Sequence, residues 1–292
     1  MASAFIGLNE NNAGINFDSR YIAYGLRKSG NLQSIGGWPR LLLKSVNLDP
    51  TRPSSYSETS VTDILFGFSV QGAIAPIVFI NGSGVSCGSS KVGDTTTFLF
   101  LLASASTKFY YFDLMSDNGP INGVKCWNEA GDLTFNSSQI PLNVIASVTA
   151  PQPPATDPRL PNQYGAVYQG GSNGWDKPSG LAGYFTSFTS RIFVPVASGD
   201  CAACITFSRS MGQGRRERSS PPDPANSPAL TNLMATMEGC FGVNGGVTFV
   251  ACDAAHTTMY GSTSAANSYF DIPAVLPDAL VIRSSDYPFP YN

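Results

Sequence analysis

Apolar and β-branched residues occur along the chain in short runs, each bounded by Gly, Asn, Ser or Pro. Such runs are typical of β-strands. The sequence predicts strands at 61–70, 74–80, 95–102, 108–114, 184–196, 204–208, 247–251 and 279–283. Asn-Gly pairs at Asn81, Asn122 and Asn244 predict tight reversals, because Asn and Gly tolerate a positive φ. We therefore predict an all-β protein of antiparallel, β-sandwich-like domains.

One segment has the periodicity of a helix instead. Its apolar positions are spaced i, i+3, i+4 and i+7, at Leu230, Leu233, Met234 and Met237. Ser227 is a suitable N-cap, Pro228 suits the first helical position, and Gly239 can end the helix. We expect one short α-helix packed on the sheets; a helix that docks a partner is the alternative.

Domain boundaries are indicated by length and by proline. A chain of 292 residues favours two domains. The segment 150–161 contains five prolines and should be extended and stiff. We predict an N-terminal β domain over 1–149, a Pro-rich linker over 150–161 and a C-terminal β domain over 162–292.

Composition restricts the chemistry. The net charge of −3 and the pI near 5.1 argue against nucleic-acid binding. The longest apolar runs are strand-sized and predict no membrane insertion, and the N-terminus has no signal-peptide pattern, so synthesis in a cytoplasm is expected. His256 is the only histidine, and its surroundings match no nucleophile motif. We expect no cofactor and no catalytic residue, although carboxylates distant in sequence leave glycoside hydrolysis open.

Two cysteines, Cys201 and Cys204, have the C-x-x-C spacing that can hold a tetrahedral metal. A zinc site would need further ligands, and Cys240, Cys252 and His256 are loosely spaced candidates. Buried, reduced thiols are the favoured interpretation, with no metal.

A self-similarity links the segments 7–20 and 123–137. With one residue inserted in the second copy, the matched pairs are Asn11/Asn128, Ala13/Ala130, Gly14/Gly131, Ile15/Leu133, Phe17/Phe135, Asp18/Asn136 and Ser19/Ser137. Each copy predicts a strand, an Asn-x-Ala-Gly turn and a second strand that ends in Asp/Asn-Ser. The pattern is a hairpin used twice, not a solenoid repeat.

This pattern resembles the opening of small tail-tip and tail-fibre-associated proteins of tailed bacteriophages, in which the same phrase can recur in mid-chain. The first copy departs from it through polar Asn9 and Asn11, and residues 150–292 are not covered. The resemblance implies a non-enzymatic virion protein of the phage tail, assembled in the host cytoplasm. It would take part in host-receptor attachment, form homo-oligomers and contact other tail, fibre or baseplate proteins. A purely structural tail or baseplate connector and a glycan-degrading tail enzyme are the alternatives.

Binding residues are suggested by composition. The segment 164–175 mixes aromatic rings with Gly, Ser and Asn, as binding loops do, and inward-packed aromatics are the other interpretation. We predict that the C-terminal domain binds the host receptor, a glycan or a protein, through Tyr164, Tyr168, Asn173 and Trp175. The N-terminal domain would attach to the virion. Tyr287, Phe289 and Tyr291, in a Pro-interrupted tail, are candidates for docking a partner, and a frayed end is the alternative.

Overall fold

The computed structural model describes residues 6–8, 15–18, 21–44, 49, 52–117, 123–156, 158, 162–176, 187–216, 231–254, 258–262 and 268–292. Over these residues the chain is built of strands, with two short 3₁₀ turns, η1 (Pro53–Ser55) and η2 (Ser284–Asp286). The predicted all-β fold with antiparallel sheets is confirmed. In the described part, neither helical turn is long or apolar enough to cross a bilayer.

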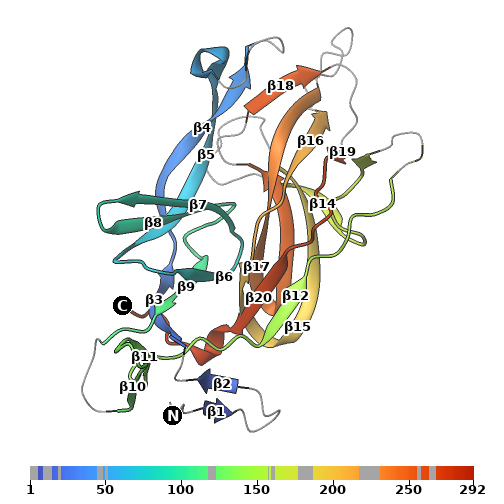
Figure 1. The fold of residues 1–292 in the computed structure, drawn as a ribbon. Coiled ribbons are helices and arrows are strands. Elements are labelled where there is room, and N and C mark those ends of the chain that lie inside the picture. Colours follow the sequence, from blue (N-terminus) through green and yellow to red (C-terminus); the bar gives the residue numbers. More distant parts are fainter. Residues whose placement is uncertain are drawn as a thin grey trace.

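The first half of the chain contains a β-sandwich (Figure 1). Its strands are β3 (Tyr24–Asn31), β4 (Gln33–Leu43), β5 (Tyr56–Gln71), β6 (Ile77–Asn81), β7 (Val85–Val92), β8 (Thr95–Leu101) and β9 (Lys108–Leu114). One layer has the order β3-β9-β6 and the other β4-β5-β8-β7. Between them, the rings of Phe68 and Phe109 stack with centroids 3.7 Å apart. Aromatic burial of this kind supplies much of the driving force for folding.

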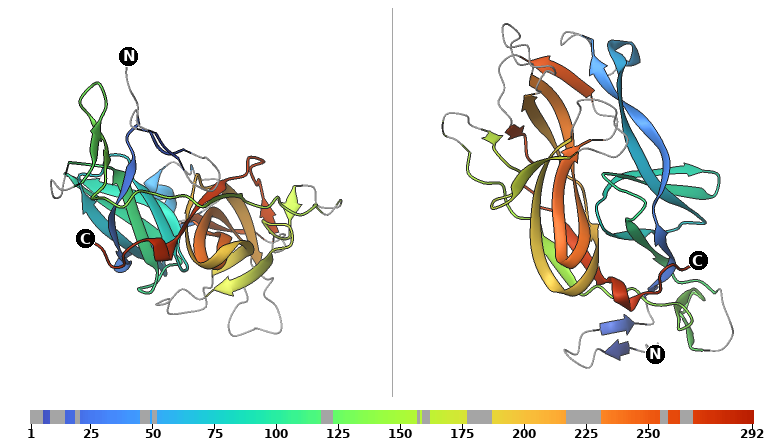
Figure 2. Two further views of the ribbon diagram at one scale, coloured as in Figure 1. Left: turned by 90° about the horizontal axis from the view of Figure 1, so that it is seen from below. Right: turned by 180° about the vertical axis from the view of Figure 1, so that it is seen from behind.

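The second half forms a strongly curved sheet beside the sandwich (Figure 2). Its strands are β12 (Ala146–Thr149), β13 (Gln163–Tyr164), β14 (Ser172–Asp176), β15 (Ser187–Ile205), β16 (Ser210–Arg216), β17 (Thr231–Asp253), β18 (Thr258–Ser262), β19 (Ser268–Phe270) and β20 (Asp278–Arg283). The first part of β15 pairs with β17 and its last part with β20, with a register irregularity between Pro195 and Asp200.

Strand β17 is buried on both faces. Val247, Phe249 and Ala251 belong to the core inside the curved sheet. Val250 and Cys252 instead join the core of the sandwich, together with Phe241. Because successive side chains of a strand point to opposite faces, a strand between two cores reads as an unbroken apolar run.

The two halves also share backbone hydrogen bonds. The end of β6 contacts β15 through Ile80 and Ala203, and β17 through a parallel bridge between Asn81 and Gly242. The Asn81 Nδ2 donates to the Cys201 carbonyl at 2.7 Å. At the predicted boundary, β12 pairs with β20, so the chain before residue 150 already contributes to the curved sheet. The division into 1–149 and 162–292 stays a prediction.

A buried ion cluster fixes the long β4–β5 hairpin to β17. The Arg40 side chain is 1% exposed and donates to Asp63 at 2.7 Å and to Asp253 at 2.7 Å. Arg40 lies on β4, Asp63 on β5 and Asp253 at the end of β17. Burial of a guanidinium is tolerated only when carboxylates pair with it, and here two do so.

The predicted helix over 227–239 is wrong in its described part. Residues 231–239 belong to β17, which pairs with β16 on one side and with β18 on the other. Leu233 and Met234 therefore sit in a sheet, because pairing on both edges and burial outweigh the weak helical preference of these residues. The Asn244-Gly245 reversal is also wrong. Gly245 has a φ of +84°, but β17 continues through it, opposite the irregularity of β15.

Removal of the Arg40 charge should be strongly destabilising. In Arg40→Met, the Asp63 and Asp253 carboxylates stay buried without their shared cation, so the free energy of unfolding should fall by about 3–5 kcal/mol. Arg52, whose side chain is 75% exposed, provides the matched control, and Arg52→Met should change stability by about 0.5 kcal/mol or less. Guanidinium denaturation measures both, and equal midpoints for the two variants would contradict the role of Arg40.

Substitution of Gly242 tests the junction between the halves. A Cβ at this position would lie 2.1 Å from the Cys201 carbonyl oxygen, which is backbone and cannot swing away. We expect Gly242→Ala to lower the free energy of unfolding by about 3 kcal/mol. Gly165→Ala is the control, since no atom lies within 4 Å of its added Cβ. Thermal unfolding of both variants decides, and a stable Gly242→Ala protein would show that the two halves do not need this close approach.

Candidate functional site

The four predicted receptor-binding residues do not form one exposed patch. Tyr164 on β13 is half-buried against the core inside the curved sheet. Tyr168 is 1% exposed, and its hydroxyl donates to Glu238 Oε1 at 2.9 Å. Asn173 on β14 is exposed, and its Nδ2 donates to the Gly165 carbonyl at 2.5 Å, which joins the two ends of this segment. The backbone of Trp175 pairs with Phe188, and its side chain lies outside the described part.

Tyr168 belongs to a second buried ion cluster. The Arg209 Nε donates to Glu238 Oε2 at 2.6 Å and its Nη2 to Oε1 at 2.9 Å, and both side chains are 0% exposed. Burial and the neighbouring Glu238 carboxylate hold the pKa of Tyr168 well above its ordinary value. The Tyr168 hydroxyl therefore stays protonated and acts as a structural donor rather than as a surface contact.

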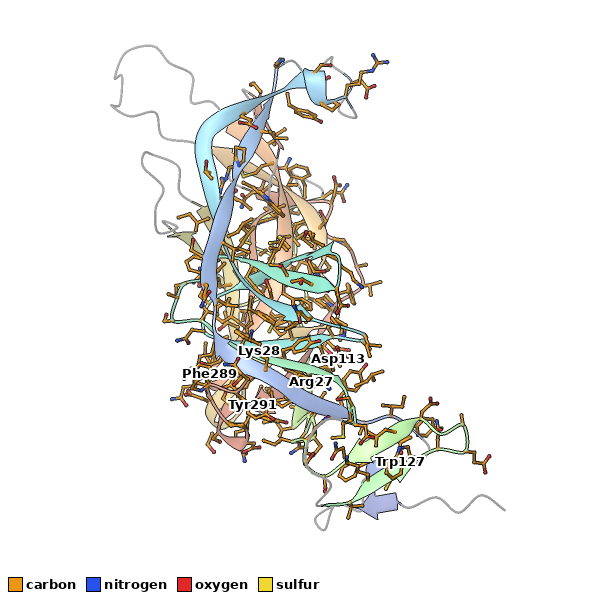
Figure 3. All side chains as sticks on the ribbon, turned by 90° about the vertical axis from the view of Figure 1, so that its left-hand side faces the viewer. Arg27, Lys28, Asp113, Trp127, Phe289 and Tyr291 are labelled. Carbon is orange, nitrogen blue, oxygen red and sulfur yellow. The ribbon has the colours of Figure 1, made fainter. Side chains whose placement is uncertain are left out.

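The three residues predicted to dock a partner, Tyr287, Phe289 and Tyr291, contact other parts of the same chain. Tyr287 is 6% exposed, packs on Phe112 and accepts a hydrogen bond from the Asn143 N–H at 2.8 Å. Phe289 is 36% exposed, with Lys108 Nζ 5.2 Å from its ring centroid. The backbone of Tyr291 pairs with that of Ser29: the Ser29 N–H donates to the Tyr291 carbonyl at 2.8 Å, and the Tyr291 N–H donates to the Ser29 carbonyl at 3.0 Å. The tail thus pairs with the outer edge of β3 at Ser29, where Figure 3 labels Phe289 and Tyr291.

The repeated motif forms two hairpins, β1 (Ile6–Leu8) with β2 (Ile15–Asp18) and β10 (Lys125–Trp127) with β11 (Leu133–Asn136). Phe17 and Phe135 occupy equivalent positions, and both hairpins have a register shift one residue before the leading strand ends. Leu8 and Trp127 are equivalent, since each ends the leading strand of its hairpin. The residue equivalent to Asn128 is therefore Asn9, and the predicted pair Asn11/Asn128 is wrong. The two hairpins lie at the same end of the molecule (Figures 1 and 2).

The second hairpin presents apolar surface at this end. Trp127, labelled in Figure 3, is 52% exposed. Val124 is 58% exposed. The turn of this hairpin is closed by a hydrogen bond from the Asp132 N–H to Asn128 Oδ1 at 2.8 Å, and Gly131 has a φ of +84°. A large exposed aromatic ring is typical of protein contact sites.

A hollow of about 560 Å³ lies on the sandwich between β3, β5, β8 and β9. Its charged side chains are those of Arg27, Lys28 and Asp113, which lie close together in Figure 3, and Asn292 of the tail also lines it. Ser69, Gln71, Thr95 and Ser116 add hydroxyl and amide groups. Gln71 and Ile74 at its rim are exposed, so the hollow is open to solvent.

Asp113 organises the wall of this hollow. Its Oδ1 accepts the N–H groups of Ala75 and Leu114, each at 2.8 Å. Its Oδ2 accepts the Ile74 N–H at 2.9 Å and the Tyr111 hydroxyl at 2.5 Å. Burial alone would raise the pKa of Asp113, but the hydrogen bonds from Tyr111 and the three backbone groups lower it below its ordinary value. The carboxylate is ionised and its acceptor capacity is occupied, which suits a structural role.

Cys201 and Cys204 do not converge. They lie three positions apart on β15, where side chains alternate between faces, so Cys201 joins the core inside the curved sheet and Cys204 packs against another core cluster. Burial raises the pKa of the Cys204 thiol to about 11. Among the described residues, no group of three His, Cys, Asp or Glu side chains could hold a metal ion. His256 lies outside the described residues.

The pH dependence of stability should report on Asp113. Because its folded-state pKa lies below the ordinary value of about 3.9, its contribution is present above that pH and is lost as the pH falls through the folded-state pKa. At pH 7, Asp113→Asn should lower the free energy of unfolding by about 1–3 kcal/mol relative to the unmodified chain. This difference between the two proteins should become smaller below about pH 4. Urea unfolding from pH 2.5 to pH 7 is the measurement, with exposed Asp94→Asn as control. A difference that is independent of pH would contradict this role.

Comparisons with known proteins leave the site to be interpreted from its own geometry. No protein-family model, no curated protein and no solved structure matches the chain significantly.

Proposed function

We propose that this chain is a non-enzymatic virion protein of a tailed bacteriophage, located at the tail tip or among the tail fibres and taking part in attachment to the host receptor. The observation that carries the proposal is the duplicated hairpin. Three of the seven matched pairs, Ile15/Leu133, Phe17/Phe135 and Asp18/Asn136, occupy equivalent register positions in the two hairpins, which lie at one end of the molecule.

The arrangement of charge supports a role in binding. The buried carboxylates Asp63, Asp253 and Glu238 are paired with arginines, and Asp113 is held by four donors. These groups stabilise the fold, and their hydrogen bonds leave little capacity for acid–base chemistry. In this proposal the protein works by presenting a rigid β surface, with the hairpin end directed toward the virion.

A purely structural connector between tail components is the second candidate. The exposure of Trp127 and Val124 on the second hairpin favours it, because both suit a contact with another tail protein. The two candidates share the virion location and differ in whether the chain itself binds cells.

Immunogold electron microscopy of intact virions tests the location. We expect antibodies raised against the full chain to label the distal tail, and labelling of the capsid alone, or of no particle, would contradict the proposal. In a second assay, purified full chain should bind susceptible cells and slow phage adsorption. Labelled tails without cell binding would favour the connector.

The role of the hairpin end can be separated from cell binding. In phage carrying Trp127→Ser, incorporation of the chain into virions should fall at least tenfold, because the exposed ring supplies contact area to its neighbour. Binding of the purified variant to cells should stay unchanged. Val92→Ser, a substitution of a residue 78% exposed on the β7 edge, is the control and should be incorporated normally. Quantitative immunoblots of purified particles measure incorporation, and equal amounts of all three proteins would contradict the prediction.

A further inference from the structure

A β-bulge in β3 places two consecutive cations in the same hollow. Leu26 pairs with Phe112 and Lys28 with Tyr111, so Arg27 is an extra residue without a register partner on β9. In a regular strand, Arg27 and Lys28 would point to opposite faces. With the bulge, both side chains line the hollow. Bulges that redirect a side chain in this way are found at binding and active sites.

Both cations retain donors for a ligand. Arg27 Nη1 donates to Ser116 Oγ, and Lys28 Nζ donates to the Ser69 carbonyl at 3.2 Å. Each side chain has several N–H donors, so these bonds use only part of its capacity. In the described part of the chain, neither forms an ion pair with a carboxylate.

Within the part of the chain that the structure describes, the Asp113 carboxylate in the hollow forms no ion pair with Arg27 or Lys28. Both oxygens of Asp113 are occupied by Tyr111 and three backbone N–H groups. The side chains that line the hollow therefore include two cations and one carboxylate whose hydrogen bonds point into the protein. A ligand carboxylate meets a planar guanidinium and a mobile ammonium side by side, which is a favourable arrangement for charge-assisted hydrogen bonds.

The rest of the lining suits the body of a sugar. Ser69, Thr95 and Ser116 supply hydroxyls and Gln71 supplies an amide, which can exchange hydrogen bonds with sugar hydroxyls. Ile74 is 75% exposed at the rim and offers an apolar contact for the C–H face of a ring. The opening to solvent leaves room for the rest of a polymer.

We propose that this hollow binds a carboxylate-bearing sugar unit of an acidic glycan, with Arg27 and Lys28 holding the carboxylate. The inference deepens the receptor-binding part of the proposed function by naming its ligand class. The ligand would therefore be recognised by the sandwich, whereas the sequence alone predicts recognition by residues 164–175.

Titration calorimetry or NMR titration of the full chain with sodium glucuronate tests the site, with glucose as the matched neutral sugar. Glucuronate should bind with at least a tenfold lower Kd than glucose, and added NaCl should weaken its binding. Arg27→Gln and Lys28→Gln should each raise the glucuronate Kd by about tenfold or more. The exposed cations Arg52 and Lys91 give the controls Arg52→Gln and Lys91→Gln, which should bind as the unmodified chain does. Circular dichroism verifies that every variant is folded.

Further probes distinguish the ligand class. Equal or tighter binding of inorganic phosphate would overturn the sugar assignment in favour of a simple anion site, and binding of triglutamate without binding of glucuronate would overturn it in favour of an acidic peptide. Folded Arg27→Gln and Lys28→Gln proteins that bind glucuronate as the controls do would overturn the site. Because the assay needs neither virions nor cells, glucuronate binding by a chain absent from the phage tail would refute the proposed function alone.

Discussion

Strand β17 has no solvent-facing side over residues 247–252, and this double burial determines how the rest of the chain is placed. One row of its side chains completes the core of the curved sheet and the other completes the core of the sandwich. The close approach of Gly242 to Cys201 and the pairing of Arg40 with Asp253 secure the same strand at two further points. The sandwich and the curved sheet are therefore joined through this one strand.

Local sequence patterns predict the strands best where a run is short, apolar and clearly bounded. Residues 108–114 coincide with β9, because this run of aromatic residues alternates between two cores. The same logic fails at 227–239, since Leu and Met spaced three and four apart are compatible with a helix and with a strand buried on both faces. At Asn244-Gly245, the glycine accommodates a bend in a continuing strand, which no local rule separates from a hairpin turn.

The candidate site was largely hidden from sequence analysis. The aromatic content of 164–175 leaves open whether its rings bind a partner or pack inward. Tyr168 packs inward, and the acceptor of its hydroxyl, Glu238, lies seventy residues away. The cations of the hollow are adjacent in sequence, and an Arg-Lys pair in a strand normally divides between two faces. Only the pairing of β3 with β9 reveals the extra residue at Arg27. A bulge depends on both strands, so one strand's sequence cannot indicate it.

The tail that covers the outer edge of β3 has a consequence for synthesis on the ribosome. Ser29 Oγ donates to the Pro288 carbonyl, across 259 positions of the chain, and Tyr291 pairs with the same residue. Until residues 288–291 have emerged, the edge of β3 at Ser29 is open, and an unpaired strand edge is able to join another growing chain. Closure of this edge therefore waits for a segment that is synthesised about 259 residues after Ser29.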